Sequence, residues 1–149
     1  LGWLDYNHNG GAITLSANTW TDLPNNGLGA FTNKNYPPSS VSEVLDTSTG
    51  YLDFNQLSLG SELLLRTDVS VTPDTDKCLF EMRYLLGGGA GEYPLKFYAE
   101  RLDSGSGTPY ERVTSFPIYM GDLNTQGNPG RLQARLSTNG TIINNGVYA

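Results

Sequence analysis

The sequence predicts an all-β fold, and within that class a jelly-roll β-sandwich of about eight to ten antiparallel strands. Hydrophobic and polar residues alternate along much of the chain, which is typical of strands with one buried face. Glycine and proline are frequent, with 18 and 8 residues, and they fall between the alternating segments as turn signals. The length of 149 residues fits one domain, which we place at 1–149.

The clearest strands are two long alternating segments, 62–71 and 78–86. A buried face is predicted for Leu63, Leu65, Thr67, Val69 and Val71 in the first segment, and for Cys78, Phe80, Met82, Tyr84 and Leu86 in the second. A turn at 73–76 separates them, so we expect the two to pair as a long hairpin. Cys78 is in phase with the buried face and is expected to be a small core residue.

The other elements are shorter and are bounded by turn residues. Strands are predicted at 13–17, 19–23, 44–45, 51–54, 93–100, 110–120, 131–137, 141–143 and 147–148. Trp20 is expected in the core. Pro117 cannot donate to a sheet ladder, so its strand is expected at an edge or a bulge. The Asn-Gly pairs at 139–140 and 145–146 predict tight turns.

Charge and composition restrict the possible partners. The net charge of −6 argues against a general nucleic-acid binder and against docking on an anionic membrane surface. No apolar run approaches the length of a membrane span. The lone Cys78 cannot form a disulfide within the chain. The start at Leu1 and the end inside a strand-like pattern suggest part of a longer chain.

Catalytic chemistry finds little support, and we expect no enzyme and no cofactor. His8 is the single histidine, so any Ser–His or Cys–His arrangement would have to use it, and no G-x-S-x-G elbow is present. A carboxylate pair could hydrolyse glycans, but the sequence identifies no pair. Glu62 and Glu81 fall on predicted outward faces, where solvated charge is ordinary.

Two short stretches match the opening of a calcium loop, at 5–10 and 122–127. The twelfth positions, Ser16 and Gln133, lack the required glutamate. We therefore expect Asx-turns and no metal site, while calcium binding stays an open alternative.

Aromatic residues cluster among asparagines in the first quarter of the chain. Rigid rings bury much area at a low entropy cost, so this cluster is a candidate partner-binding surface. Its residues are Trp3, Tyr6, Phe31 and Tyr36.

The segments 45–54 and 59–65 resemble the middle of C1q/TNF-like jelly rolls. Thr49, Gly50, Gly60 and the strand at Leu63 match that pattern, which is a Thr-Gly, an aromatic-containing strand, a short loop, and then a glycine with a long hydrophobic strand. The short loop lacks the usual proline, so the match is partial.

A longer resemblance is to virion structural proteins of tailed bacteriophages. It involves the blocks at 3–7, 18–21, 26–29, 32–34, 36–38, 46–50 and 118–122. The resemblance implies a TNF-like homotrimer on a phage particle. The partner would be the major capsid protein if the chain is a decoration protein that stabilises the head. The alternative is a receptor-recognition knob on a tail or head fibre, with a host surface glycan as partner.

An obligate trimer hides apolar residues that a single subunit would expose. Candidates for this interface lie on otherwise polar strand faces or carry large rings: Leu64, Leu79, Leu85, Tyr98 and Tyr119.

Overall fold

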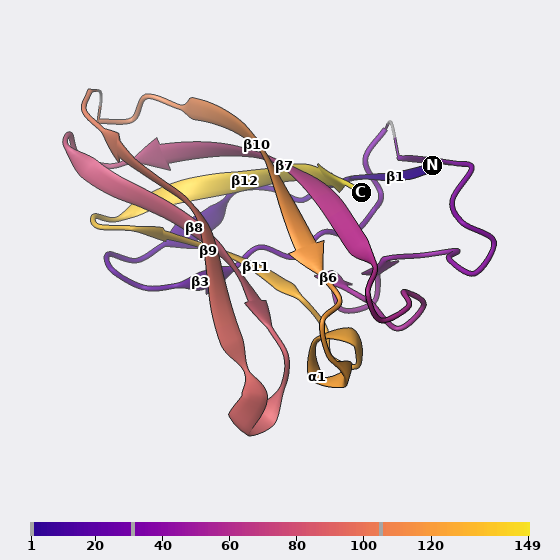
Figure 1. Ribbon diagram of the computed structural model, residues 1–149. Coiled ribbons are helices and arrows are strands. Elements are labelled where there is room, and N and C mark those ends of the chain that lie inside the picture. Colours follow the sequence, from indigo (N-terminus) through magenta and orange to yellow (C-terminus); the bar gives the residue numbers. More distant parts are fainter. Residues whose placement is uncertain (1, 31, 105) are drawn as a thin grey trace.

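The chain folds as a β-sandwich in the computed structural model, which describes residues 2–30, 32–104 and 106–149 (Figure 1). The larger layer, here the β7 sheet, has the order β10-β7-β12-β1-β4, and β2 pairs with β12. Its strands are β1 (Trp3–Asn7), β2 (Ile13–Leu15), β4 (Asn33–Asn35), β7 (Glu62–Pro73), β10 (Tyr110–Tyr119) and β12 (Gly140–Tyr148).

The second layer, here the β8 sheet, has the order β3-β11-β8-β9. Its strands are β3 (Thr21–Asp22), β8 (Cys78–Leu86), β9 (Tyr93–Leu102) and β11 (Arg131–Leu136). The smaller elements are β5 (Leu45–Asp46) paired with β6 (Tyr51–Leu52), the 3-10 turn η1 (Gly89–Gly91) and the short helix α1 (Leu123–Gln126). No helix among the described residues is long and apolar enough to cross a membrane.

The predicted all-β jelly-roll class is confirmed. All the strand pairs are antiparallel, and the chain passes repeatedly between the layers: β7, β10 and β12 lie in one sheet, and β8, β9 and β11 in the other. The first strand, β1, pairs with the last strand, β12. Closing a sandwich by pairing distant strands in this way is the jelly-roll arrangement.

The predicted hairpin between segments 62–71 and 78–86 is wrong. Strand β7 pairs with β10 and β12, whereas β8 pairs with β9 and β11, so the turn between them crosses from one sheet to the other. Both segments carry the predicted apolar face, and the two faces oppose each other across the core. The hydroxyls of Thr67 and Tyr84 meet there at 2.7 Å.

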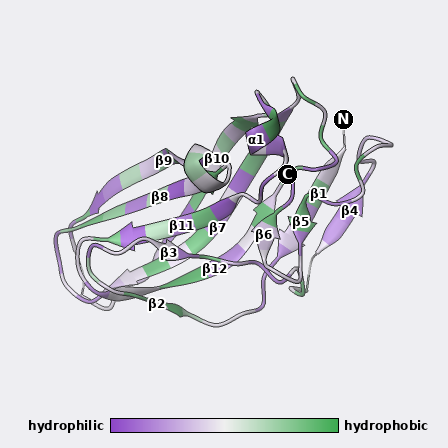
Figure 2. Ribbon diagram, turned by 90° about the horizontal axis from the view of Figure 1, so that it is seen from below, coloured by the Kyte–Doolittle hydropathy of each residue, from purple (hydrophilic) through white to green (hydrophobic). Residues whose placement is uncertain are grey.

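The inward faces of both sheets build one core, and Figure 2 shows hydrophobic and hydrophilic residues alternating along the strands that supply it. The rings of Tyr84, Phe97 and Phe116 stack with one another, with centroids between 5.1 and 6.4 Å apart. Cys78 is fully buried, which confirms its predicted place in the core.

The two Asn-Gly pairs do not form hairpin turns. Asn139-Gly140 connects β11 to β12, which lie in different sheets. Asn145-Gly146 lies inside β12, where the pairing with β7 shifts register between Asn144 and Gly146. Gly146 has φ of 151°, a conformation that favours glycine, so its signal marks a bulge rather than a turn.

Two further expectations need correction. Trp20 is only half-buried, because β3 pairs with β11 at the rim of the β8 sheet and leaves its ring on the outer face. Glu81 faces outward but is 7% exposed, since Lys96 and Arg135 pair with its carboxylate. The expectation for Pro117 is confirmed, because β10 is an edge strand.

Candidate binding face

The outer face of the β7 sheet presents apolar side chains where a strand face in water is normally polar. Leu64 of β7 is 58% exposed, and its register partner on β10 is Pro117. Two more outward residues of β10, Val113 and Tyr119, are 59% and 62% exposed. We call these four residues the β7–β10 patch. Large exposed apolar side chains that gather on one face of a sheet mark interaction sites in soluble proteins.

The same face continues across β12 to β1. The ring of Trp3 stacks on that of Tyr148, with centroids 5.5 Å apart and planes 19° from parallel. The guanidinium of Arg66 lies over Tyr148, 5.1 Å from the ring centroid. Aromatic rings and a stacked arginine are the groups that protein interfaces favour.

An open groove of about 980 Å³ adjoins this face, between the start of β7 and the loop that follows β4. Trp3, Leu64 and Tyr148 belong to its lining, and therefore the groove and the outer face are one continuous surface. The opposite side is formed by Pro37, Pro38, Val41 and Leu57, with several serine hydroxyls between them. The groove offers apolar contact and a few hydrogen-bonding groups.

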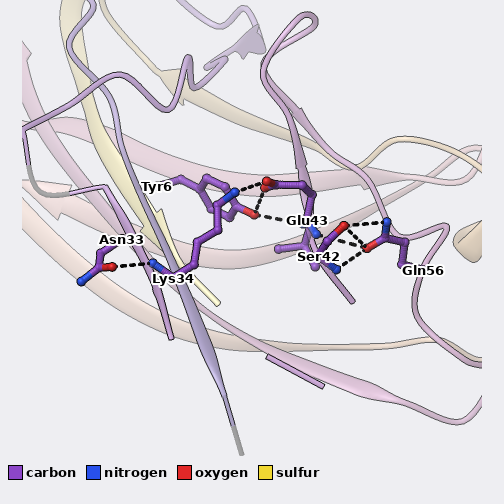
Figure 3. A network of polar contacts seen from close by, with 7 residues as sticks. Tyr6, Asn33, Lys34, Ser42, Glu43 and Gln56 are labelled. Atoms are coloured by element: carbon purple, nitrogen blue, oxygen red, sulfur yellow. Dashed lines mark hydrogen bonds and ion pairs between the residues drawn. The ribbon is translucent and has the colours of Figure 1, made fainter. Parts of the chain in front are cut away.

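A polar network supports the loop beside the groove (Figure 3). Tyr6 donates its hydroxyl proton to Glu43 at 2.6 Å, and the backbone N–H of Val44 donates to the same hydroxyl oxygen at 3.1 Å. Lys34 forms an ion pair with Glu43. Gln56 accepts hydrogen bonds from the backbone N–H groups of Ser42 and Glu43 through its side-chain oxygen.

The network also shifts two pKa values. Burial and the hydrogen bond to Glu43 raise the pKa of Tyr6 far above its usual value. Partial burial tends to raise the pKa of Glu43, but the hydrogen bonds from Lys34 and Tyr6 outweigh that effect and the pKa is lowered. The negative charge of Glu43 therefore holds the loop to β1 and β4.

The structure does not gather the predicted interface residues on one face. Leu64 and Tyr119 lie on the outer face of the β7 sheet. Leu79 is exposed on the outer face of the β8 sheet. Tyr98 is half-buried against Phe80 at the side of the sandwich. Leu85 is only 9% exposed, because other residues of the same chain already cover it. The expectation that a partner subunit covers Leu85 is therefore wrong.

The predicted aromatic surface is also divided. Tyr36 is 83% exposed, and Trp3 is half-buried in its stack with Tyr148. Tyr6 is 1% exposed, so its place at a partner surface is wrong; the alternation in β1 turns it inward with Leu4. Phe31 lies outside the described residues.

Sequence reasoning did not single out Val113 and Pro117 as surface contacts. Both follow the alternation of the strand 110–119, so the period of that strand was the signal that could have found them. The exposed Leu59 and Leu123 were missed as well. They lie in loop and helix positions where no strand period applies.

The two calcium-like stretches take different structures. Asp5 and Asn7 belong to strand β1 rather than to a loop. Asp122 caps α1 by accepting the backbone N–H of Thr125 at 2.7 Å, and Asn124 accepts the N–H of Gly88 at 3.1 Å. The bond of Asp122 is the local geometry that the sequence predicts, whereas Asn124 bonds to a residue far along the chain, and the expected Asx-turn at Asp5 is wrong because that residue lies in a strand. Within residues 2–30, 32–104 and 106–149, no group of three or more His, Cys, Asp or Glu side chains could hold a metal ion.

Comparisons with family models and with curated proteins find no match for this chain. No model of a known protein family matches it, and no curated protein is significantly similar.

Proposed function

We propose that the chain is a capsid decoration protein of a tailed bacteriophage, which forms a homotrimer and binds the outer surface of the particle. The observation that carries the proposal is the exposed β7–β10 patch on a jelly-roll fold. Burying a leucine such as Leu64 against a partner contributes about 1.5–3 kcal/mol. Several such contacts, repeated around a threefold axis, would stabilise a trimer.

In this proposal the partner is the major capsid protein and the location is the virion. A decoration protein acts through contact area multiplied over many copies, so each individual contact is modest. Its exposed residues then serve two purposes, namely association with sister copies and attachment to the shell.

Light scattering coupled to size-exclusion chromatography tests the trimer. The wild-type protein is expected at three times the mass of one chain, and Leu64→Asp as a monomer, because a charge in the patch opposes burial. Leu79→Asp is the matched control, since it makes the same change on the outer face of the other sheet. A monomeric wild type would refute the trimer, and an unchanged Leu64→Asp trimer would remove the patch from the interface.

One observation favours a second function, recognition of a host glycan by a fibre knob. Tyr36 is 83% exposed and has φ of 50°, an unusual conformation for a large residue. An exposed ring held by its backbone can stack on a sugar. Loss of glycan-array binding in Tyr36→Ala, together with a few dozen copies or fewer per virion, would favour the knob. Hundreds of copies without glycan binding would favour decoration.

A further inference from the structure

The positive charges of this acidic protein gather on the outer face of the β8 sheet, opposite the β7–β10 patch. Five of the nine lysines and arginines lie on it: Arg83, Lys96, Arg101, Arg131 and Arg135. The carboxylates that pair with them are Asp22, Glu81, Glu92 and Asp103. The face therefore carries +1, whereas the remaining four cations and eleven carboxylates carry −7.

Arg83 stands out among these cations. No carboxylate of the described residues lies within 4.0 Å of its guanidinium, and its register partner on β9 is another cation, Lys96. Its Nε–H donates to the side-chain oxygen of Gln133 at 2.7 Å, and in the described part of the chain its other N–H groups have no acceptor. Like charges opposite each other destabilise a sheet, so a carboxylate bound directly to the Arg83 guanidinium would be stabilised there.

Trp20 completes the centre of the face. The guanidinium of Arg83 lies 4.2 Å from the ring centroid, and that of Arg135 lies 5.8 Å away. Burial lowers the pKa of Arg83, and the guanidinium groups of Arg131 and Arg135 act in the same direction, although the carboxylates of Glu92 and Asp22 partly oppose them. Leu79, which is 42% exposed, lies on the same face. Tryptophan and arginine are the residues that dominate binding energy at protein interfaces.

We infer that the outer face of the β8 sheet is a docking surface for a carboxylate-rich protein surface, with Arg83 and Trp20 at its centre. The planar guanidinium of Arg83 binds a carboxylate with two parallel hydrogen bonds, and the ring of Trp20 packs beside it. A protein partner fits better than a nucleic acid, because the other four cations are already paired and the net charge is only +1.

The identity of this partner as the phage shell rests on the proposed function, but the docking chemistry does not. The trimer would use the β7 sheet and the carboxylate partner the β8 sheet, so the two contacts lie on opposite faces. Carboxylate binding can therefore be absent from a protein that is a trimer, and it can be present in a protein that is a monomer.

The test is a titration of the ¹⁵N-labelled protein with poly-L-glutamate at low salt, followed by nuclear magnetic resonance. We expect the Trp20 indole and Arg83 Nε signals to shift, and the affinity to fall as salt is added. Arg83→Gln should weaken binding by about tenfold or more, because a charge-assisted pair is lost. Arg101→Gln, a matched control whose guanidinium already pairs with Asp103, should change it less than about threefold.

Shifts confined to other faces, or no binding at all, would overturn the inference. So would equal losses in Arg83→Gln and Arg101→Gln, which would indicate a diffuse charge effect. Single-stranded DNA that binds this face more tightly than poly-L-glutamate would replace the protein partner with a nucleic acid. The fold of Arg83→Gln is checked by its amide signals, which should match those of the wild type away from the substitution. The salt dependence of binding to the wild-type protein tests the charge contact without any variant.

Discussion

The hydrogen bond between Thr67 and Tyr84 joins the two sheets inside the core, and its removal gives a quantitative test of the fold. The hydroxyls lie 2.7 Å apart, and both residues are at most 1% exposed. Thr67→Val keeps the shape of the side chain but leaves the Tyr84 hydroxyl buried without that partner. Tyr84→Phe does the reverse and leaves the Thr67 hydroxyl in the core.

The magnitude follows from the cost of an unsatisfied buried polar group. Each single substitution should lower the free energy of unfolding by about 1–3 kcal/mol. The double variant removes both hydroxyls, so its loss should be well below the sum of the two single losses. For a chain of this length, each kcal/mol corresponds to about 2–4 °C in Tm.

Urea denaturation of the four proteins at equal concentration measures the effect, and Tyr51→Phe supplies the control. The Tyr51 hydroxyl donates to Asp22 at 3.0 Å near the surface, where water can replace it, so its loss should be smaller. Losses in the Thr67 and Tyr84 variants that simply add would refute the coupling. A Thr67→Val protein as stable as the wild type would refute the opposed placement of β7 and β8.

Three further predictions concern other parts of the fold. Gly146→Ala should destabilise by about 2 kcal/mol or more in urea, because the new methyl would lie 2.5 Å from the Tyr6 carbonyl oxygen at φ of 151°; wild-type stability would contradict this bulge. Folding lowers the pKa of Glu43 from its usual 4.5. The ionised carboxylate therefore stabilises the folded state above pH 4.5, and this stabilisation is lost as the pH falls through the pKa of the folded state. The stability advantage over Glu43→Gln should shrink on acidification, and a constant difference from pH 7 to pH 3 would count against the ion pair with Lys34. EDTA should leave Tm unchanged if the Asp5 and Asp122 oxygens serve only the fold; a fall reversed by Ca²⁺ would assign a site.

Most strands were predictable from the sequence because alternation is a local property, although β1 and β4 were not predicted. Each residue of β7 from Leu65 to Val71, apart from the buried Thr67, reports its own face through its polarity. Pairing is not local, and therefore the prediction joined two long neighbouring segments that in fact face each other across the core. The turn predicted at the Asn-Gly pair 145–146 was wrong for a related reason. The same dipeptide occurs in turns and in bulges, and only the pairing with the partner strand distinguishes the two.

The candidate surfaces were predictable in part. Leu64 and Tyr119 were found because an apolar residue on a polar strand face is visible in the sequence. The environment of Trp20 was not predictable, because the two arginines beside its ring, Arg83 and Arg135, belong to β8 and β11, far along the chain. Tyr6 was misplaced because its partner, Glu43, lies in a loop with no period of its own.

The position of β12 between β7 and β1 has a consequence for biosynthesis. It is the last of the described strands to leave the ribosome, yet each of its two neighbours pairs with it along one edge. Until β12 emerges, a nascent chain therefore leaves one edge of β1 and one edge of β7 unpaired, and non-local closure of this kind is slow. Chaperone capture or self-association of ribosome-bound chains should be greatest just before this strand emerges.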